Sequence, residues 1–235
     1  MPTNDGANRE PFEYLRIVVK GFFALLITIV FIFILAGRLT YWQGWVFSIV
    51  TVLLVVVQLL LFAGKTDLAR ERFKPGPGTK WWDKLFWALY APLFFAIVIL
   101  ACLDAGRFRW SPELPVAVYI TSYLAYIYSI YLYSWAMWVN PWFSSTVRIQ
   151  TDRDQQVVQD GPYRYLRHPG YTAGILMALS TAVALGSLWA LIPAGLVVLL
   201  LIIRTFLEDR TLQNELPGYA EYAHKVQYRL VPGLW

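Results

Sequence analysis

Asp160-Gly-Pro-Tyr-Arg-Tyr-Leu-Arg-His-Pro-Gly-Tyr-Thr-Ala-Gly174 decides the fold, because it places a polar, proline-rich segment directly before an apolar one. Residues that precede proline disfavour helix, so the two prolines predict an irregular or short helical stretch over 161–168, which we call the ledge. A helix is expected to begin near Pro169. Its small residues recur at every fourth position, so another helix or a ligand can approach it closely. These residues are Gly170, Gly174, Ala178, Ala182 and Gly186.

The composition places the chain among integral membrane proteins. Of the 235 residues, 58% are hydrophobic and 15% are charged, which predicts an all-α integral membrane protein. The single cysteine, Cys102, excludes an internal disulfide, and two histidines, His168 and His224, are too few for a zinc cluster, so we expect no metal site. The formal charge of +5 comes from basic residues beside apolar segments. It therefore indicates membrane orientation and not a nucleic-acid partner.

The apolar runs predict about six transmembrane helices. Residues 1–139 are expected to form the N-terminal transmembrane part, with a retained first helix in place of a cleaved signal peptide. Residues 140–235 are expected to form a catalytic region with a helical hairpin and a C-terminal tail that closes a cofactor pocket. The expected spans are 17–36, 44–63, 85–103 and 115–139 in the first part, and 170–186 and 188–207 in the hairpin.

The distribution of basic residues predicts the orientation. Of the 20 Lys and Arg residues, six spans would place 17 on the side of the N-terminus and only three, Arg38, Arg107 and Arg109, on the other. Positive charge favours the cytoplasmic side. Both termini, the ledge and the tail are therefore expected in the cytoplasm.

Two groups of polar side chains allow alternative interpretations. Tyr119, Tyr123, Tyr126 and Tyr133 lie inside the fourth span, where their hydroxyls could bond to neighbouring helices or line a substrate groove. Arg204 and Glu208 follow the last apolar run and share one helix face. They could form a snorkelling ion pair at the membrane boundary, or they could share a ligand.

The C-terminal hundred residues resemble the isoprenylcysteine carboxyl methyltransferase family and its phospholipid N-methyltransferase relatives. The resemblance rests on Gly161-Pro-Tyr163, Arg167-His-Pro-Gly-Tyr171 and Gly174, followed after the hairpin by Arg204 and Glu208-Asp209. Asp209 stands where the family usually has a second glutamate.

The resemblance implies an enzyme that uses S-adenosyl-L-methionine and releases S-adenosyl-L-homocysteine. Such a cofactor needs apolar or aromatic walls, backbone hydrogen bonds and an acid for its ammonium group. No Gly-x-Gly-x-x-Gly motif follows an expected strand, so a Rossmann methyltransferase domain is not expected. The expected cofactor-binding residues are Gln155, Gln156, Val157, Val158, Tyr163, His168, Pro169, Gly170, Tyr171 and Glu208.

The resemblance also implies the catalytic residues, which we expect to be Arg204, Glu208 and His168. A carboxylate acceptor is already ionised at neutral pH and needs only alignment and a cation, for which Arg204 would bind the substrate. An amine acceptor must lose a proton, so His168 or Glu208 would act as base. Alternatively, His168 could only cap the hairpin helix, and Arg167 could bind a lipid phosphate.

The expected function is methyl transfer to a lipophilic acceptor, with a carboxylate preferred as the acceptor group. The acceptor would be a lipophilic small molecule, a lipid or a lipidated peptide, reached from the surrounding membrane lipids. A phospholipid or amine N-methyltransferase is the alternative within the class. Two alternatives lie outside this class. One is a sterol-reductase-like enzyme that binds NADPH, but the carboxylates of Glu208 and Asp209 argue against it because they would repel the phosphates of NADPH. The other is a non-enzymatic membrane protein.

Overall fold

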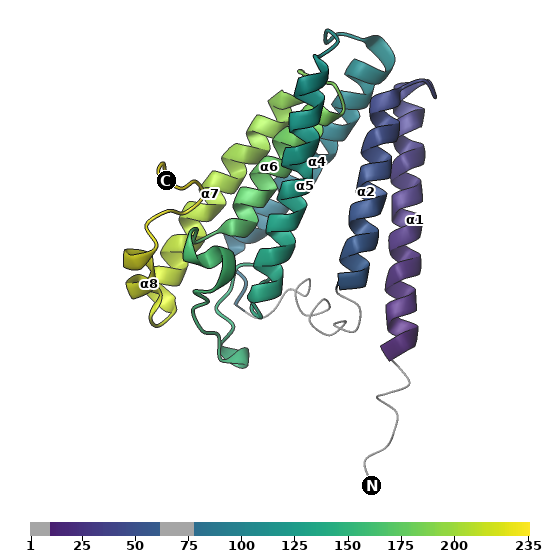
Figure 1. Cartoon of the computed structure of the whole chain (residues 1–235). Coiled ribbons are helices and arrows are strands. Elements are labelled where there is room, and N and C mark those ends of the chain that lie inside the picture. The colour runs from purple at the N-terminus through teal and green to yellow at the C-terminus, as the bar shows by residue number, and fades with distance from the viewer. Residues whose placement is uncertain (1–9, 62–77) are drawn as a thin grey trace.

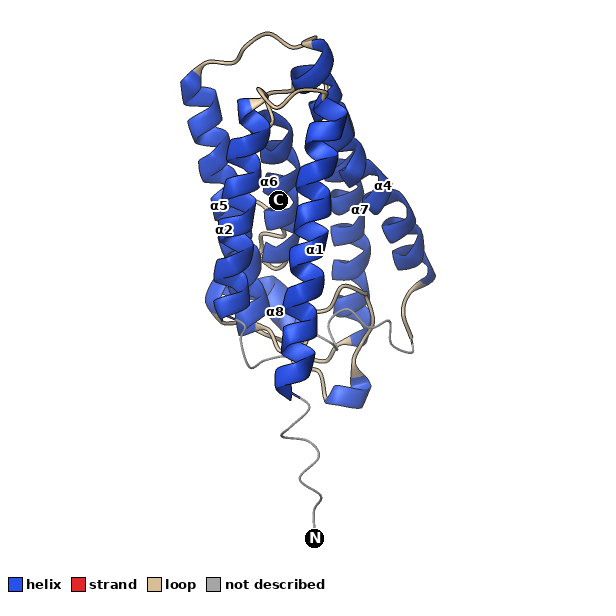
Figure 2. Cartoon of the chain, turned by 90° about the vertical axis from the view of Figure 1, so that its right-hand side faces the viewer, coloured by secondary structure: helices blue, strands red, loops and turns tan. Residues whose placement is uncertain are grey.

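The computed structural model describes residues 10–61 and 78–235, and within these ranges the chain contains helices and loops but no strands (Figures 1 and 2). The all-α fold expected from the composition is confirmed. In chain order the helices are α1 (Glu10–Ala36), α2 (Trp42–Leu61), α4 (Trp81–Ala101), the π-helical η1 (Cys102–Phe108), α5 (Val116–Val139), the 3₁₀ turns η2 (Thr151–Arg153) and η3 (Gly161–Arg164), α6 (Pro169–Ala184), α7 (Leu191–Glu215) and α8 (Tyr219–Lys225).

Among the described residues, five helices are long and apolar enough to cross a membrane: α1, α2, α4 with η1, α5 and α7. The protein is thus a multi-pass integral membrane protein. The first helix of the expected hairpin, α6, has 16 residues. At 1.5 Å per residue it is about 24 Å long, shorter than the ~30 Å hydrocarbon core.

Several expected boundaries differ from the structure; α1 begins at Glu10 and not at residue 17, and α7 ends at Glu215 and not at residue 207. The third span begins at Trp81 and not at residue 85, and it continues through η1 to Phe108. The second hairpin helix begins at Leu191 and not at residue 188, because Gly186 has a φ of +81° and the Ser187 hydroxyl accepts a hydrogen bond from Ala190 N. Residues 62 and 63 of the second expected span lie outside the described ranges.

The helices run up and down between two ends of the molecule (Figure 1). The beginning of α1, the end of α2, the loop after α5 and helix α8 all lie at one end, which we call the tail end. The α1–α2 turn, the η1–α5 connection and the α6–α7 turn lie at the opposite end. The ledge and the tail are therefore at the same end of the bundle, as expected.

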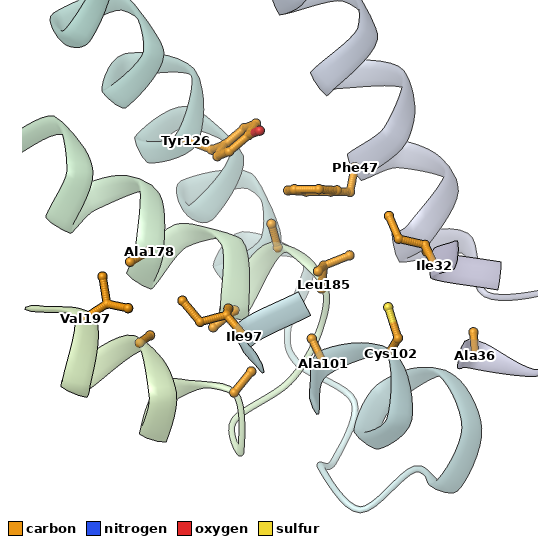
Figure 3. Packing of buried hydrophobic residues seen from close by; sticks show 14 of the residues in the cluster. Ile32, Ala36, Phe47, Ile97, Ala101, Cys102, Tyr126, Ala178, Leu185 and Val197 are labelled. Carbon is orange, nitrogen blue, oxygen red and sulfur yellow. The ribbon is translucent and has the colours of Figure 1, made fainter. Parts of the chain in front are cut away.

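The small residues of α6 permit close helix packing. Ala178 and Ala182 are fully buried in the apolar core (Figure 3). A Cβ atom added to Gly174 would lie 3.2 Å from the Cδ1 atom of Leu201, so α7 packs directly against this glycine. Close approach of another helix is thus confirmed.

Tyrosine hydroxyls in α5 bond to neighbouring helices. Gln43 Nε2 donates to the Tyr119 hydroxyl at 3.2 Å, and the Tyr123 hydroxyl donates to the Ala184 carbonyl at 3.2 Å. The hydroxyls of Tyr126 and Thr51 are 3.2 Å apart. These three tyrosines confirm the packing interpretation.

A buried carboxylate joins three segments at the end opposite the tail. Asp104 of η1 is fully buried and accepts hydrogen bonds from the hydroxyls of Ser111 and Ser187 and, at 2.7 Å, from Ser111 N. The Tyr41 hydroxyl donates to the carbonyl of Leu185 nearby. Neutral donors thus satisfy Asp104, and the α6–α7 turn is held to the α4–α5 connection.

Candidate functional site

A cavity of about 380 Å³ lies at the tail end of the bundle. Its walls come from α4, α5, α6, α7 and the polar loop that follows α5. All the residues expected at the site line this one cavity, although their individual roles remain predictions. They are Gln155, Gln156, Val157, Val158, Tyr163, His168, Pro169, Gly170, Tyr171, Arg204 and Glu208.

The ledge takes its shape from a left-handed glycine and from pairing with the tail. Gly161 has a φ of +58°, and a Cβ atom there would lie 2.8 Å from the Val139 Cγ2 atom, so only glycine fits without strain. Further along, the backbone amides of Arg167 and His168 donate to the carbonyls of Tyr228 and Arg229, each at 3.0 Å. The tail thereby fixes the ledge beside the cavity.

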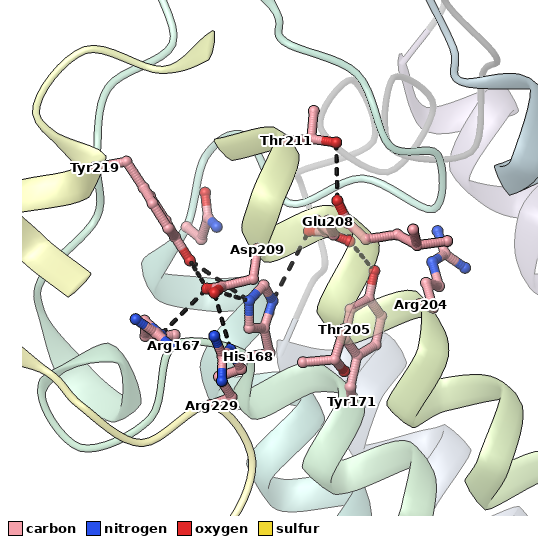
Figure 4. Close-up of polar contacts among 12 residues, drawn as sticks. Arg167, His168, Tyr171, Arg204, Thr205, Glu208, Asp209, Thr211, Tyr219 and Arg229 are labelled. Carbon is pink, nitrogen blue, oxygen red and sulfur yellow. Dashed lines mark hydrogen bonds and ion pairs between the residues drawn. The ribbon is translucent and has the colours of Figure 1, made fainter. Parts of the chain in front are cut away.

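Asp209 is the centre of an ion-pair network that joins the ledge, α7 and the tail (Figure 4). Its carboxylate is 1% exposed and lies 3.2 Å from Arg167 Nε, 2.9 Å from Arg229 Nε and 3.2 Å from His168 Nε2. The Tyr219 hydroxyl donates to it at 3.1 Å. A buried carboxylate between two arginines stabilises the folded protein only while both of its charged partners are present. Asp209 therefore serves chiefly to hold the tail to the ledge.

The network includes two ledge residues, His168 and Arg167, whose roles the sequence left open. His168 occupies the N-cap position of α6, but its side chain makes no capping hydrogen bond and turns instead to Asp209. Helix capping by His168 is therefore wrong. Arg167 is buried, pairs with the same carboxylate and lines the cavity, and its contact with a lipid phosphate stays a prediction.

Glu208 directly precedes Asp209 in the sequence but points to the other side of His168, into the cavity (Figure 4). It accepts a hydrogen bond from the Tyr171 hydroxyl, and its Oε1 atom lies 4.0 Å from His168 Nδ1. The rings of His168 and Tyr171 stack with centroids 5.7 Å apart. Glu208 remains 21% exposed, so its carboxylate stays accessible to a bound molecule.

The partner of Arg204 differs from the one that the spacing suggested. The expected alternative was a boundary ion pair with Glu208, yet Arg204 Nη2 lies 2.7 Å from Asp83 Oδ1 and donates to Ser145 O at 2.7 Å. Its guanidinium carbon is 4.2 Å from the centroid of the Phe86 ring. Arg204 is 3% exposed, so it does not snorkel to water.

Sequence reasoning missed the contribution of α4 to the cavity. Phe86 and Trp87 line the cavity and Asp83 pairs with Arg204 beside it; all three belong to the first turns of this helix, whose expected start is residue 85. No short-range pattern connects them to Arg204. Other wall residues that sequence reasoning missed include Tyr90, Ile130, Met177 and Leu201. Tyr133 also lines the cavity, which agrees with the groove interpretation for this one tyrosine.

Burial raises the pKa of three tyrosine hydroxyls beside the cavity, those of Tyr163, Tyr219 and Tyr222, and the neighbouring Asp209 carboxylate raises the pKa of Tyr219 further. Their hydroxyls therefore keep their protons at neutral pH. Accordingly, the Tyr222 hydroxyl donates to the Tyr163 carbonyl at 2.7 Å, which closes the wall between ledge and tail.

The cavity offers the groups that an adenosyl cofactor requires. Within the described part of the chain, the backbone amides of Gln156, Val157 and Val158 make no hydrogen bond, so they can serve a ligand. The Glu208 carboxylate suits an ammonium group, and the rings of Tyr163 and Tyr171 provide aromatic wall. The residues present thus fit such a molecule. In the described residues, no cluster of three potential metal ligands occurs.

Comparison with known proteins identifies the class of enzyme. The sequence model of a family described as phospholipid methyltransferase matches residues 117–217, which include α5, the ledge, α6 and α7. The search of curated proteins gave no significant match. The family match supports the phospholipid methyltransferase relatives in the resemblance, and it sets aside the sterol-reductase-like and non-enzymatic alternatives. The chain is therefore an integral membrane methyltransferase that uses S-adenosylmethionine, and residues 117–217 are similar to the phospholipid methyltransferase family.

Proposed function

We propose that the enzyme methylates the carboxylate of a lipophilic acceptor, as the isoprenylcysteine carboxyl methyltransferases do. The observation that carries this proposal is the state of Arg204. Its buried Nε atom has no hydrogen-bond acceptor among the described residues, and the side chain lines the cavity. A buried donor without a partner costs free energy that an anionic ligand would recover. A carboxylate is such a ligand.

The cofactor would occupy the part of the cavity beside the ledge. The amides of residues 156–158 would hydrogen-bond its base, and Glu208 would hold its ammonium group, with the Tyr171 hydroxyl keeping that carboxylate in place. When bound, S-adenosylmethionine supplies a methyl group activated by a sulfonium. The apolar walls formed by Tyr90, Ile130 and Leu201 exclude water and accept the hydrocarbon part of the acceptor.

For a carboxylate acceptor the protein needs to move no proton. Arg204 neutralises the charge of the acceptor and aligns it, while His168 only supports Glu208 and Asp209. The reaction should therefore depend little on pH in the range where histidine changes its charge.

An amine phospholipid is the second candidate, and two observations favour it: the family match and the position of His168. His168 Nε2 contacts Asp209, which leaves Nδ1 on the side of Glu208, 4.0 Å from its Oε1 atom. The proton of an ammonium headgroup could pass to Nδ1 or to Glu208. This candidate therefore requires a general base, which the carboxylate candidate does not.

Product chemistry separates the two candidates. The purified protein is incubated with a methyl-labelled cofactor and, separately, with a prenylated cysteine bearing a free carboxylate and with phosphatidylethanolamine. Alkali hydrolyses a methyl ester and releases labelled, volatile methanol, whereas an N-methyl group stays on the nitrogen of the headgroup and is not volatile. Alkali-labile label in the first acceptor supports the proposal, alkali-stable label in the second supports the alternative, and label in neither refutes both.

We also propose that the tail end faces the cytoplasm, as the distribution of Lys and Arg indicates. The only cysteine, Cys102, is buried, so single-cysteine labelling has little background. Glu221→Cys on α8 and Glu113→Cys before α5 replace exposed residues at opposite ends. In intact cells a membrane-impermeant thiol reagent should label only the second variant. Labelling of only the first would reverse the orientation.

A further inference from the structure

Asp83 stands out among the buried groups that the structure describes because it lies in α4, before the matched residues 117–217, and yet pairs with Arg204, which lines the cavity. Its side chain is fully buried. Oδ1 is 2.7 Å from Arg204 Nη2, and Oδ2 accepts a hydrogen bond from Val147 N at 3.1 Å. One carboxylate thus joins α4, α7 and the loop that follows α5.

The same corner of α4 surrounds the guanidinium of Arg204 on several sides. Phe86 lies under it at 4.2 Å, and Trp87 lies 5.3 Å from it. Trp87 Nε1 donates to Ser145 O at 2.9 Å, and this carbonyl also accepts from Arg204 Nη2. These contacts place the Nη2 side of the guanidinium against α4 and leave the Nε atom without a protein acceptor. A planar guanidinium fixed along one edge presents its remaining donors in one direction.

From this geometry we propose that Asp83 is a positioning residue for the acceptor site, which acts by orienting Arg204. The proposal rests on the proposed role of Arg204 toward an anionic acceptor group. Asp83 fixes the plane of the guanidinium and compensates part of its charge in a place where an unpaired cation would be costly. The acceptor site is therefore completed by a helix outside the methyltransferase domain.

The test is a double-mutant cycle on the full-length protein in detergent or nanodiscs. Asp83→Asn keeps the shape and the acceptor for Val147 N but removes the charge that pairs with Arg204. Misorienting Arg204 should lower kcat/KM for the methylated acceptor by about tenfold to a hundredfold, because small displacements of a binding group have effects of this size. The affinity for S-adenosylhomocysteine should stay within about twofold, since Asp83 does not contact the ledge.

The cycle is completed with Arg204→Lys and the double variant. If Asp83 acts through Arg204, Asp83→Asn should change kcat/KM much less in the Arg204→Lys background than in the wild-type background. Asp104→Asn is the matched control, because Asp104 is equally buried but lies at the opposite end of the bundle. It should lower the melting temperature and leave kcat/KM unchanged.

Asp83→Glu covers the case in which Asp83→Asn does not fold. It keeps the charge and moves the carboxylate by one methylene, so positioning predicts a lower kcat/KM with unchanged S-adenosylhomocysteine affinity. The inference would be overturned if the effects of the two substitutions on kcat/KM were additive. Where Asp83→Asn does not fold, it would be overturned by a folded Asp83→Glu with normal kinetics. If the wild-type protein methylates neither acceptor, the proposed function is refuted, and with it a positioning role of Asp83 in catalysis. Coupling between the Asp83 and Arg204 variants in the melting temperature would still report the ion pair.

Discussion

Replacing Asp209 by asparagine should release the tail from the ledge. The carboxylate is 1% exposed and lies within 3.2 Å of nitrogen atoms of Arg167, Arg229 and His168. Asparagine keeps one oxygen acceptor but leaves the buried Arg167 and the partly exposed Arg229 without this counter-charge. Removing one partner of a buried ion pair costs about 3–5 kcal/mol. For a chain of this size that corresponds to a loss of ~10 °C in melting temperature.

The measurement is thermal unfolding of detergent-purified protein, together with S-adenosylhomocysteine binding below the transition. Asp152→Asn is the control, because Asp152 pairs with Arg148 at the surface with half of its side chain exposed, and such pairs contribute little. We expect Asp209→Asn to lower both the melting temperature and the cofactor affinity, because the ledge lines the cavity. A melting temperature equal to that of Asp152→Asn would refute the role of Asp209 as the centre of the network.

Three further substitutions test individual contacts. Glu208→Gln should weaken S-adenosylhomocysteine binding by roughly tenfold to a hundredfold in calorimetry, because it loses a charge-assisted hydrogen bond of about 1.5–3 kcal/mol. An unchanged dissociation constant would contradict the assignment of Glu208 to the cofactor. Arg204→Lys, which keeps the charge but loses the planar fork, should lower kcat and raise the acceptor KM in steady-state assays; a parallel loss of cofactor affinity would place Arg204 with the cofactor instead. Tyr219→Phe removes one hydroxyl donor to Asp209 and should lower the free energy of unfolding by about 1 kcal/mol in denaturant titrations, with no change expected if that hydrogen bond contributes nothing.

Local signals in the sequence were sufficient for the ledge and for the hairpin. Pro162, Pro169 and Gly161 restrict the backbone strongly, so the irregular segment and the start of α6 could be predicted within a residue. The apolar runs gave the membrane spans, because a bilayer requires about 20 such residues. The lining of one cavity by the ledge, Arg204 and Glu208 also followed, since both segments were expected at the same end.

Contacts between distant segments were beyond the reach of these signals. The helical start at Trp81 could not be predicted, because Trp81, Trp82 and Asp83 have the composition of a membrane boundary. The pairing of Asp83 with Arg204 depends on how α4 packs against α7. Similarly, Asp209 and Glu208 are adjacent in sequence, and only the packing of His168 between them assigns one to the fold and the other to the cavity.

The shortness of α6 has a consequence for how the enzyme meets its acceptor. If the α6–α7 turn lies at one membrane surface, a helix of about 24 Å ends some 6 Å below the other edge of the hydrocarbon core. His168 and Tyr171, at this end of α6, then lie inside the leaflet and not above it. An acceptor can enter by lateral diffusion without being extracted into water, where each exposed methylene would cost about 0.8 kcal/mol. The relevant substrate concentration is thus the mole fraction in the membrane, and adding inert lipid at constant total acceptor should slow the reaction.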